Sequence, residues 1–239
     1  MPESIAGIAS VLVSGLFIIT FVVQAFEIPS RSMEDTLLVG DHVFVDRFTP
    51  AAKAGYLGPL APYRPVHRLD IVVFISPSER GLYVVKRVIG TPGDRIRLHD
   101  RVVYVNGVPE PEPYVKYLSN SRDFYRDNFP SVSPDGVPNV TPEWPAVLRQ
   151  NIQNGELVVP PHSYFAMGDD REVSLDSRYW GFIPEENVIG RPLFIYWSFD
   201  TPDDQYQHTE MGERVKFIGH VILHFFDKTR WNRMFRLVR

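Results

Sequence analysis

The chain has 239 residues, of which 25 are basic and 29 acidic, for a net charge of −4 and an isoelectric point near 6.0. This balance gives no indication of a nucleic-acid partner. Cysteine is absent, which excludes a disulfide framework and a thiolate metal site. Frequent proline (21), glycine (16) and aromatic residues (13%) are typical of β-structure with many turns.

An apolar segment near the N-terminus, IAGIASVLVSGLFIITFVVQAF, covers residues 5–26 without a charge. As a helix it would be roughly 33 Å long, close to the hydrocarbon thickness of a bilayer. A secretory signal peptide would have a shorter apolar core after a basic stretch. A buried core helix is the other alternative, but this segment is apolar on all faces. We therefore expect a transmembrane anchor over residues 1–27, and the flanking charges leave its orientation open.

Strand patterns follow this segment. Residues 41–48 alternate, and 70–76 and 82–90 are apolar runs typical of buried strands. The second run ends at TPGD, where Pro92 and Gly93 suit the centre of a type II turn. A hairpin is expected over 94–110, with a tight turn at Asn106-Gly107, and further strand-like runs cover 155–170, 187–199 and 214–226.

Residues 109–153 are rich in proline and polar residues and show no clear period. They form either an inserted subdomain or a long excursion. The expected fold is therefore mainly β, with an N-terminal transmembrane helix followed by an antiparallel β-domain over 28–239 that carries an insertion at about 109–153.

Ser32 lies in PSRSMEDTLLVGD, six residues beyond Phe26 and so within about 20 Å of the expected bilayer surface. A catalytic serine needs a base within hydrogen-bond reach. The seven histidines are scattered. His220 and His224 are four residues apart and could hold a metal, but the glutamate of a zinc-protease signature is missing and the residues between them favour a strand. No metal site is expected.

Lys86 is the better candidate for the base. In YVVKRVI it shares one strand face with Val84 and Val88, and the other face is also apolar, so we expect the strand to be buried on both sides. Burial lowers the pKa of an ammonium and leaves a neutral amine that can take a proton from a hydroxyl. A snorkelling or ion-paired lysine is the alternative.

A charged loop, MGDDREVSLDSRYWGFIP, lies between apolar runs at residues 167–184. Such a loop is most often a solvated turn. Here Asp176 and Arg178 alternate with small hydroxyl residues and precede Tyr179-Trp180-Gly181, which favours an ordered polar network that supports a site.

At these three segments the chain resembles the bacterial type I signal peptidases, membrane-anchored Ser/Lys proteases that remove signal peptides from exported proteins. PSRSMEDTLLVGD resembles the family's Pro-Ser-x-Ser-Met-x-Pro-Thr-Leu box. RLDIVVF and VVKRVIGTPGD resemble its Arg-Gly-Asp strand and its Lys-Arg-Val-x-Gly-x-Pro-Gly-Asp box. GDDREVSLDSRYWGFIP resembles its Gly-Asp-Asn-Arg-x-x-Ser-x-Asp-Ser-Arg-Tyr-Trp-Gly box. With the anchor and the tail, the resemblance covers nearly the whole chain apart from about 109–153.

The resemblance implies a role for each matched residue. Ser32 would be the nucleophile and Lys86 the general base. Ser30 would donate its hydroxyl to the oxyanion beside the Ser32 N–H, and Ser174 would hold the Lys86 amine. The resemblance also implies a supporting ion-pair network of Asp176, Arg178 and Arg87, and shallow pockets for small substrate residues lined by Phe26, Ile28, Pro29, Met33 and Leu37.

Four residues depart from the boxes, none at a catalytic position. Arg31 and Leu69 replace glycines, Asp35 replaces proline and Asp170 replaces asparagine. Asp35 places a second acid beside Glu34, so its effect on pocket shape or local charge stays open.

By this resemblance the protein is a membrane-bound serine endopeptidase that cleaves signal peptides after small residues at Ala-x-Ala sites and needs no cofactor. Its partners would be signal peptides, the lipid bilayer and, as a candidate, the secretion translocon. It would be a single-pass protein of the bacterial cytoplasmic (inner) membrane with its catalytic domain on the outer face. The alternatives are a non-catalytic anchored β-domain, which the presence of Ser32 and Lys86 disfavours, and a self-cleaving Ser/Lys repressor, which the membrane segment disfavours.

The C-terminal segment DKTRWNRMFRLVR, residues 227–239, spaces its apolar residues at i, i+3, i+4 and i+7 with arginines between them. It is expected to form either a basic amphipathic helix on the membrane surface or an ordinary terminal helix packed on the β-domain.

Overall fold

The computed structural model describes residues 2–17, 22–47, 64–117, 119, 121–205 and 210–239. The chain divides into two compact units, each made of segments that are distant in the sequence. Unit 1 comprises Met1–Pro29, Val39–Pro65 and Gly190–Val238, and unit 2 comprises Ser30–Leu38, Val66–Ile189 and Arg239.

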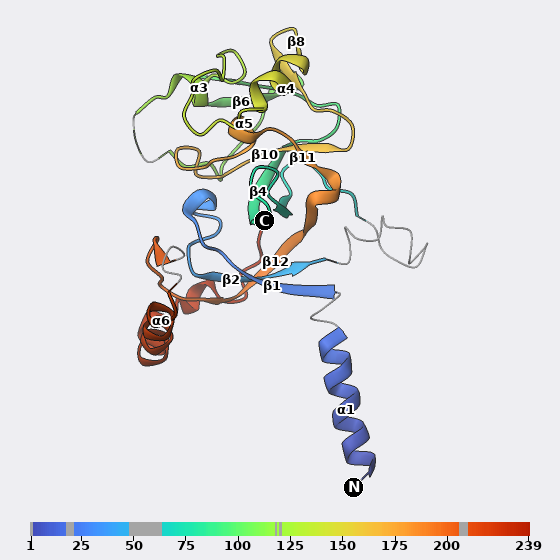
Figure 1. Cartoon of the computed structure of the whole chain (residues 1–239), viewed down its shortest axis with the longest axis vertical. Coiled ribbons are helices and arrows are strands. Elements are labelled where there is room, and N and C mark those ends of the chain that lie inside the picture. The colour runs from blue at the N-terminus through green and yellow to red at the C-terminus, as the bar shows by residue number, and fades with distance from the viewer. Residues whose placement is uncertain (1, 18–21, 48–63, 118, 120, 206–209) are drawn as a thin grey trace. The chain divides into compact units, whose positions relative to one another are not determined.

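Unit 1 is built on three antiparallel strands that lie side by side (Figure 1). Their order is β1 (Val23–Glu27), β2 (Asp41–Asp46) and β12 (Val188–Ser198), the last belonging to this unit from Gly190 on. β2 follows the expected alternation, with Val43 and Val45 fully buried. The strand predicted for 41–48 is therefore confirmed up to Asp46.

The N-terminal apolar segment forms helix α1 (Pro2–Phe17). The expected single helix over 5–26 is wrong at its C-terminal end, because Val23 to Phe26 belong to β1 and pair with residues 43–46 of β2. There the neighbouring strand satisfies the backbone polar groups that a helix would satisfy internally. Residues 18–21 of this prediction lie outside the described residues. In the part of the chain that the structure describes, no helix is both long enough and apolar enough to cross a membrane.

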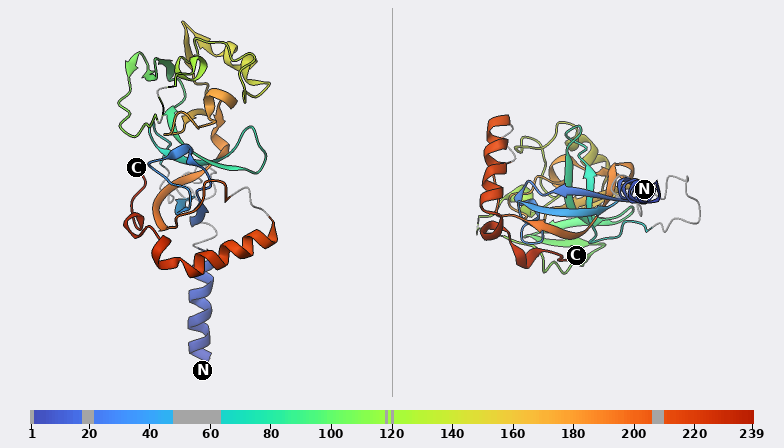
Figure 2. Two further views of the ribbon diagram at one scale, coloured as in Figure 1. Left: turned by 90° about the vertical axis from the view of Figure 1, so that its left-hand side faces the viewer. Right: turned by 90° about the horizontal axis from the view of Figure 1, so that it is seen from below.

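The prediction of a strand over 214–226 is wrong. These residues lie in helix α6 (Met211–Leu223) and in the start of α7 (Phe225–Lys228) (Figure 2). Its apolar residues recur at the helical period, and this pattern outweighed the β-branched content. The exposed side chains at i, i+4, i+7 and i+11, which we name the α6 stripe, are Met211, Val215, Ile218 and Ile222.

The C-terminal tail adopts neither of the two expected helices. After α7 it makes one turn, η7 (Trp231–Arg233), and residues 235–238 then hydrogen-bond along β12. The buried Arg233 donates to the Asp41 carboxylate at 2.6 and 3.1 Å. This ion pair needs an extended path for the tail, because Asp41 lies on β2.

Unit 2 contains two antiparallel sheets (Figure 1). In the first, the strand order within the unit is β3 (Ile71–Ile75), β4 (Tyr83–Gly90), β10 (Ser163–Met167) and β11 (Ile183–Pro184). In the second it is β7 (Val108–Pro109), β6 (Val102–Val105), β5 (Arg95–His99), β9 (Glu156–Val158) and β8 (Ile152–Gln153). The mainly β, antiparallel prediction is confirmed. The short helices are α3 (Phe124–Asp127), α4 (Trp144–Gln150), α5 (Ser177–Trp180), η2 (Arg31–Met33) and η5 (Glu185–Asn187).

Both predicted turns are present. Asp94 N donates to Thr91 O at 3.0 Å and Gly93 has φ +90°, as a type II turn requires. Asn106 and Gly107 have φ +55° and +80°, the left-handed pair that links β6 to β7.

β4 is buried on both faces over its second half, as predicted. Val88 packs into a cluster with Val72, Phe74 and Ala166, whereas Ile89 belongs to the larger cluster that fills the second sheet. The 109–153 segment contributes four side chains to that larger cluster: Tyr125, Phe129, Trp144 and Leu148. Much of this polar segment is therefore anchored by core residues.

Candidate active site

Ser32 is held in a tight turn at the start of the segment Ser30–Leu38, which we name the Ser32 loop. The turn is η2, closed by a hydrogen bond of 2.9 Å from Glu34 N to Arg31 O, and Leu37 N donates to Met33 O at 2.8 Å. Ser32 is only 9% exposed. The backbone therefore fixes the direction in which its hydroxyl points.

Lys86 reaches the Ser32 hydroxyl from the middle of β4. Its Nζ donates to Ser32 Oγ at 2.5 Å, and the side chain is only 3% exposed. The Ser30 hydroxyl lies 3.3 Å from Ser32 Oγ. Within the described residues, the Ser32 hydroxyl is therefore in hydrogen-bond contact with both side chains that were predicted to act beside it, those of Lys86 and Ser30.

Burial lowers the pKa of Lys86 from 10.5 to about 8. The carboxylates of Asp176 and Asp169 act in the opposite direction, and the Arg178 guanidinium adds to the lowering. Each carboxylate has its own arginine, so the amine faces little net negative charge. A pKa near 8 leaves roughly a tenth of the amines neutral at pH 7.

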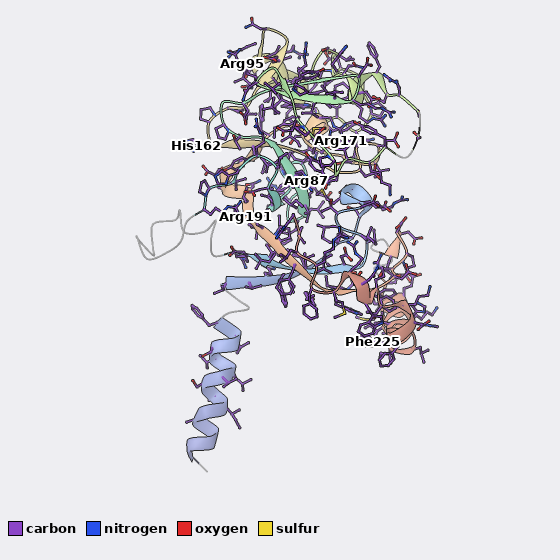
Figure 3. All side chains as sticks on the ribbon, turned by 180° about the vertical axis from the view of Figure 1, so that it is seen from behind. Arg87, Arg95, His162, Arg171, Arg191 and Phe225 are labelled. Atoms are coloured by element: carbon purple, nitrogen blue, oxygen red, sulfur yellow. The ribbon has the colours of Figure 1, made fainter. Side chains whose placement is uncertain are left out.

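Two buried ion pairs support the site, rather than one network. Arg178 donates to Asp176 through Nε at 2.8 Å and Nη2 at 2.7 Å. Arg87 donates to Asp169 through Nε at 2.9 Å and Nη2 at 2.7 Å (Figure 3). The expectation that Arg87 joins Asp176 and Arg178 is therefore wrong. Arg87 alternates with Lys86 along β4 and lies opposite Met167, so the loop that leaves β10 brings Asp169 to it.

The Asp176 carboxylate also binds two backbone N–H groups beside the site. Its side chain caps helix α5 by accepting from Arg178 N at 3.2 Å, and it also accepts from Gly168 N at 3.1 Å. Burial opposes ionisation of Asp176, but the Arg178 guanidinium and these hydrogen bonds outweigh it and lower its pKa.

Three supporting residues were missed by the sequence reading. Asp169 accepts from Thr36 Oγ1 at 2.6 Å, which ties the Ser32 loop to the Arg87 ion pair. Gly168 has no room for a side chain, since a Cβ there would overlap the Ser174 hydroxyl and the Ser32 carbonyl oxygen. Thr36, Gly168 and Asp169 all lie inside the matched boxes, and this was the sequence signal that could have identified them as supporting residues.

Ser174 is buried beside this group. In the described part of the chain its Oγ makes no hydrogen bond of good geometry, although it lies close enough to Asp176 to help lower the pKa of that carboxyl. Its expected bond to the Lys86 amine is not formed in this structure. The hydroxyl therefore has spare hydrogen-bonding capacity.

Arg31 and Asp35, two of the residues that differ from the family's boxes, each pair with a side chain of opposite charge. Arg31 Nε donates to Glu34 at 2.8 Å, and Lys116 Nζ donates to Asp35 at 2.8 Å. The second acid next to the nucleophile thus has a basic partner.

The other two departures lie in the backbone framework. Leu69 has φ +71°, a left-handed conformation that glycine adopts more easily, and its carbonyl accepts from Arg87 at 3.0 Å. Asp170 is buried, its N–H donates to Ser32 O at 3.2 Å, and burial raises the pKa of its carboxyl.

The residues expected to line substrate pockets belong to different units. Met33 and Leu37 are fully buried in unit 2. In unit 1, Ile28 is buried, Phe26 is half-buried and Pro29 is exposed. Their pocket-lining role stays a prediction. Within the described residues, no group of three or more histidine, aspartate or glutamate side chains is placed to hold a metal ion.

Comparisons with known proteins give a consistent result. The family model described as signal peptidase, peptidase S26, matches residues 2–197. Signal peptidase I of Buchnera aphidicola subsp. Acyrthosiphon pisum is 30% identical over 92% of this chain and 81% of its own length. For signal peptidase I of Pseudomonas fluorescens the values are 30%, 83% and 72%, and for that of Pseudomonas aeruginosa 31%, 77% and 68%.

A crystal structure of a signal peptidase I from Enterococcus faecalis V583 is 32% identical and covers 54% of this chain and 97% of that chain. Its TM-score is 0.40, which is too low to support a statement about the fold. The family model and the relatives, in contrast, cover most of the chain. We conclude that the chain belongs to the signal peptidase family, peptidase S26, and is a hydrolase of the bacterial type I signal peptidase group.

Proposed function

We propose that this protein is a serine endopeptidase that removes signal peptides from exported preproteins, with Ser32 as nucleophile and Lys86 as general base. One observation carries the proposal: the 2.5 Å contact between Lys86 Nζ and Ser32 Oγ, two side chains that are both buried. Once the amine is neutral, the same contact lets its lone pair accept the serine proton.

The reaction would proceed in two balanced halves. Ser32 Oγ attacks the scissile carbonyl while its proton moves to Lys86, and the carbonyl oxygen becomes an oxyanion. The C–N bond then breaks, and the Lys86 ammonium returns the proton to the leaving amine. Water attacks the resulting ester, gives one proton to Lys86, and the restored ammonium reprotonates Ser32 as the signal peptide leaves with a free carboxylate.

Two hydrogen-bond donors would stabilise the oxyanion. Ser30 supplies a hydroxyl 3.3 Å from the nucleophile, and the Ser32 N–H lies at the start of η2. Donors of this kind contribute about 3–4 kcal/mol each in proteases. We also propose that Ser174 orients the Lys86 amine during the reaction, for which its spare buried hydroxyl is suited. The preference for small residues at Ala-x-Ala sites would come from the bulky side chains expected to line the pockets.

We further propose that the protein acts at a bilayer surface. Apolar side chains along the described part of α1, such as Val11, Leu12 and Leu16, are more than half exposed, and so is the α6 stripe. An amphipathic helix can lie in a membrane interface with its apolar face buried among the lipids. The cytoplasmic membrane, the single-pass topology with an outer catalytic domain, and the translocon as a partner follow from the family resemblance.

A cleavage assay in detergent on a preprotein with an Ala-x-Ala site tests the dyad. We expect wild type to cut after the second alanine and Ser32→Ala and Lys86→Met to be folded but inactive. Lys216→Met, an exposed lysine on α6, is the matched control and should cut normally. Cleavage by folded Lys86→Met, or an inactive wild type, would overturn the proposal.

A further inference from the structure

The segment Glu112–Lys116, which lies in the expected insertion, runs along the candidate site. Three of its side chains contact residues around the site: Glu112 binds Arg171, Tyr114 covers Arg87 on β4, and Lys116 binds Asp35. The chain turns between the first and last of these residues, because Val115 N donates to Glu112 O at 3.1 Å. The three side chains are nevertheless all directed at residues around the candidate site.

Main-chain hydrogen bonds connect the segment to the nucleophile in series. Lys116 N donates to Asp169 O at 3.0 Å, and Arg171 N donates to Lys116 O at 3.4 Å, which forms a parallel bridge between Lys116 and Asp170. Asp170 N in turn donates to Ser32 O at 3.2 Å. The segment is thus joined to the loop that supports Ser32 by a single parallel bridge at Lys116.

The side-chain contacts differ in strength. The Lys116–Asp35 pair is weak because the Asp35 side chain is 71% exposed and water screens it. The Arg87 guanidinium, in contrast, is buried, and its centre lies 3.9 Å from the centre of the Tyr114 ring. Cation–π contacts are strongest where the cation has lost its water.

The Tyr114 ring is itself held in place. Its hydroxyl donates to Glu112 Oε1 at 3.1 Å, and Glu112 accepts two hydrogen bonds from the buried Arg171, at 2.5 and 3.2 Å. Figure 3 shows Arg171 on the loop that follows β10 and Arg87 on β4. These hydrogen bonds hold the Tyr114 ring over Arg87, whose guanidinium binds Asp169.

We infer that Tyr114 is a positioning residue for the proposed Ser32–Lys86 dyad. The ring keeps water from the Arg87–Asp169 pair, and Asp169 holds Thr36 of the Ser32 loop at 2.6 Å. This inference rests on the proposed function. Tyr114 touches no reacting atom, so its loss should lower kcat through misplacement of Ser32 and leave KM nearly unchanged.

Three variants test this in the full-length protein. We expect Tyr114→Leu to lower kcat about ten- to hundredfold, and Tyr114→Phe, which keeps the ring, to retain most activity. Tyr104→Leu is the matched control, because it removes a ring that lies 5.2 Å from Arg97 on the second sheet. It should cleave like wild type.

A second series separates positioning from folding. Phenylalanines with increasing numbers of fluorine atoms at position 114 keep the ring's shape but weaken the cation–π attraction. We expect kcat to fall with each fluorine. Equal activity across the series, or a folded Tyr114→Leu with wild-type kcat, would overturn the inference.

Hydrogen exchange distinguishes failure of the inference from failure of the proposed function. In Tyr114→Leu the amides of Leu37 and Asp170 should exchange faster, while in Tyr104→Leu they should not. If wild type does not cleave preproteins, the proposed function fails, and faster exchange at these amides would still support the positioning role. Unchanged exchange would refute that role independently of activity.

Discussion

The protonation state of Lys86 controls the proposed reaction. Only the neutral amine can accept the Ser32 proton, and burial brings its pKa down to about 8. We expect kcat/KM to rise with pH as one proton is lost, to fall about tenfold per pH unit on the acid side, and to level off above pH 8. A pH–rate profile measures this, and a profile without an acid limb would contradict the assignment.

The same buried amine should reduce the stability of the fold. The pKa of Lys86 is lower in the folded chain than its unfolded value of 10.5, so the unfolded state binds the proton more tightly. The penalty is present in full below about pH 8 and fades as the pH rises towards 10.5. By this linkage it amounts to about 3 kcal/mol.

Lys86→Met should therefore be more stable than wild type at pH 7, by up to about 3 kcal/mol, and the difference should shrink near pH 10. Urea denaturation at both pH values measures it. A variant that is less stable than wild type at pH 7 would mean that the contact with Ser32 contributes more than burial costs.

At the residue scale, the sequence predicted that Ser32 and Lys86 act together, and the structure places their side chains in contact at 2.5 Å. The burial of Lys86 was expected from its apolar strand, whereas the role of Ser32 came from the family resemblance of its box. The partner of Arg87 could not be predicted, because Asp169 and Asp176 are both in the matched loop. Only the pairing of Met167 with Arg87 decides between them.

Close packing at Gly168 holds the loop after β10 against the turn that carries Ser32. A Cβ at this position would overlap the Ser32 carbonyl oxygen, which cannot move without moving Ser32. We expect Gly168→Ala to lower kcat about a hundredfold and to destabilise the protein by about 1–3 kcal/mol. Kinetics and thermal unfolding measure the two effects.

Gly212→Ala is the control for this substitution. Gly212 lies in α6 with no atom close to its Cβ position, so alanine should leave cleavage unchanged and add up to about 1 kcal/mol of stability. Normal activity of Gly168→Ala would show that the loop does not fix Ser32.

Strands with a clear local pattern were predicted well, whereas α6 was mistaken for a strand and β1, which depends on a partner strand, was missed. β3 and β4 were found because an apolar run between turn residues leaves few alternatives. β1 was missed because its residues are as apolar as those of α1, and only the edge of β2 makes them a strand. The contacts of the segment 112–116 could not be predicted, because its partners Asp35, Arg87 and Arg171 come from three distant parts of the sequence.

For the whole molecule, the proposed action at a bilayer depends on which surface would contact the lipid. With α1, the α6 stripe is one of two exposed apolar surfaces of unit 1 that we propose to contact a bilayer. We expect Ile218→Glu to reduce binding to vesicles that contain anionic lipid, because a carboxylate is repelled by the surface and costly to bury. Co-flotation with vesicles measures this.

The control replaces an exposed valine of the second sheet. Val108→Glu adds the same charge on β7 in unit 2 and should leave vesicle binding unchanged. Equal flotation of wild type and Ile218→Glu would rule out the α6 stripe as a contact with the bilayer.

The order of the three boxes along the chain was enough to predict the family, but not the division into units. Each unit combines segments from distant parts of the sequence, and the Ser32 loop belongs to a different unit from the strands on either side of it. Local patterns describe how a segment folds and carry no information on which distant segments pack together. The tail shows the same limit, since its path depends on the pairing of Arg233 with Asp41.

The most direct test of the central claim is to trap the acyl-enzyme. A preprotein with an Ala-x-Ala site is mixed with wild-type protein, quenched in acid within one turnover, and digested for mass spectrometry. We predict that the signal peptide is found as an ester on the peptide that contains Ser32, and that Lys86→Met gives none. Cleavage without an ester on Ser32, or an ester on another residue, would contradict the Ser32–Lys86 assignment.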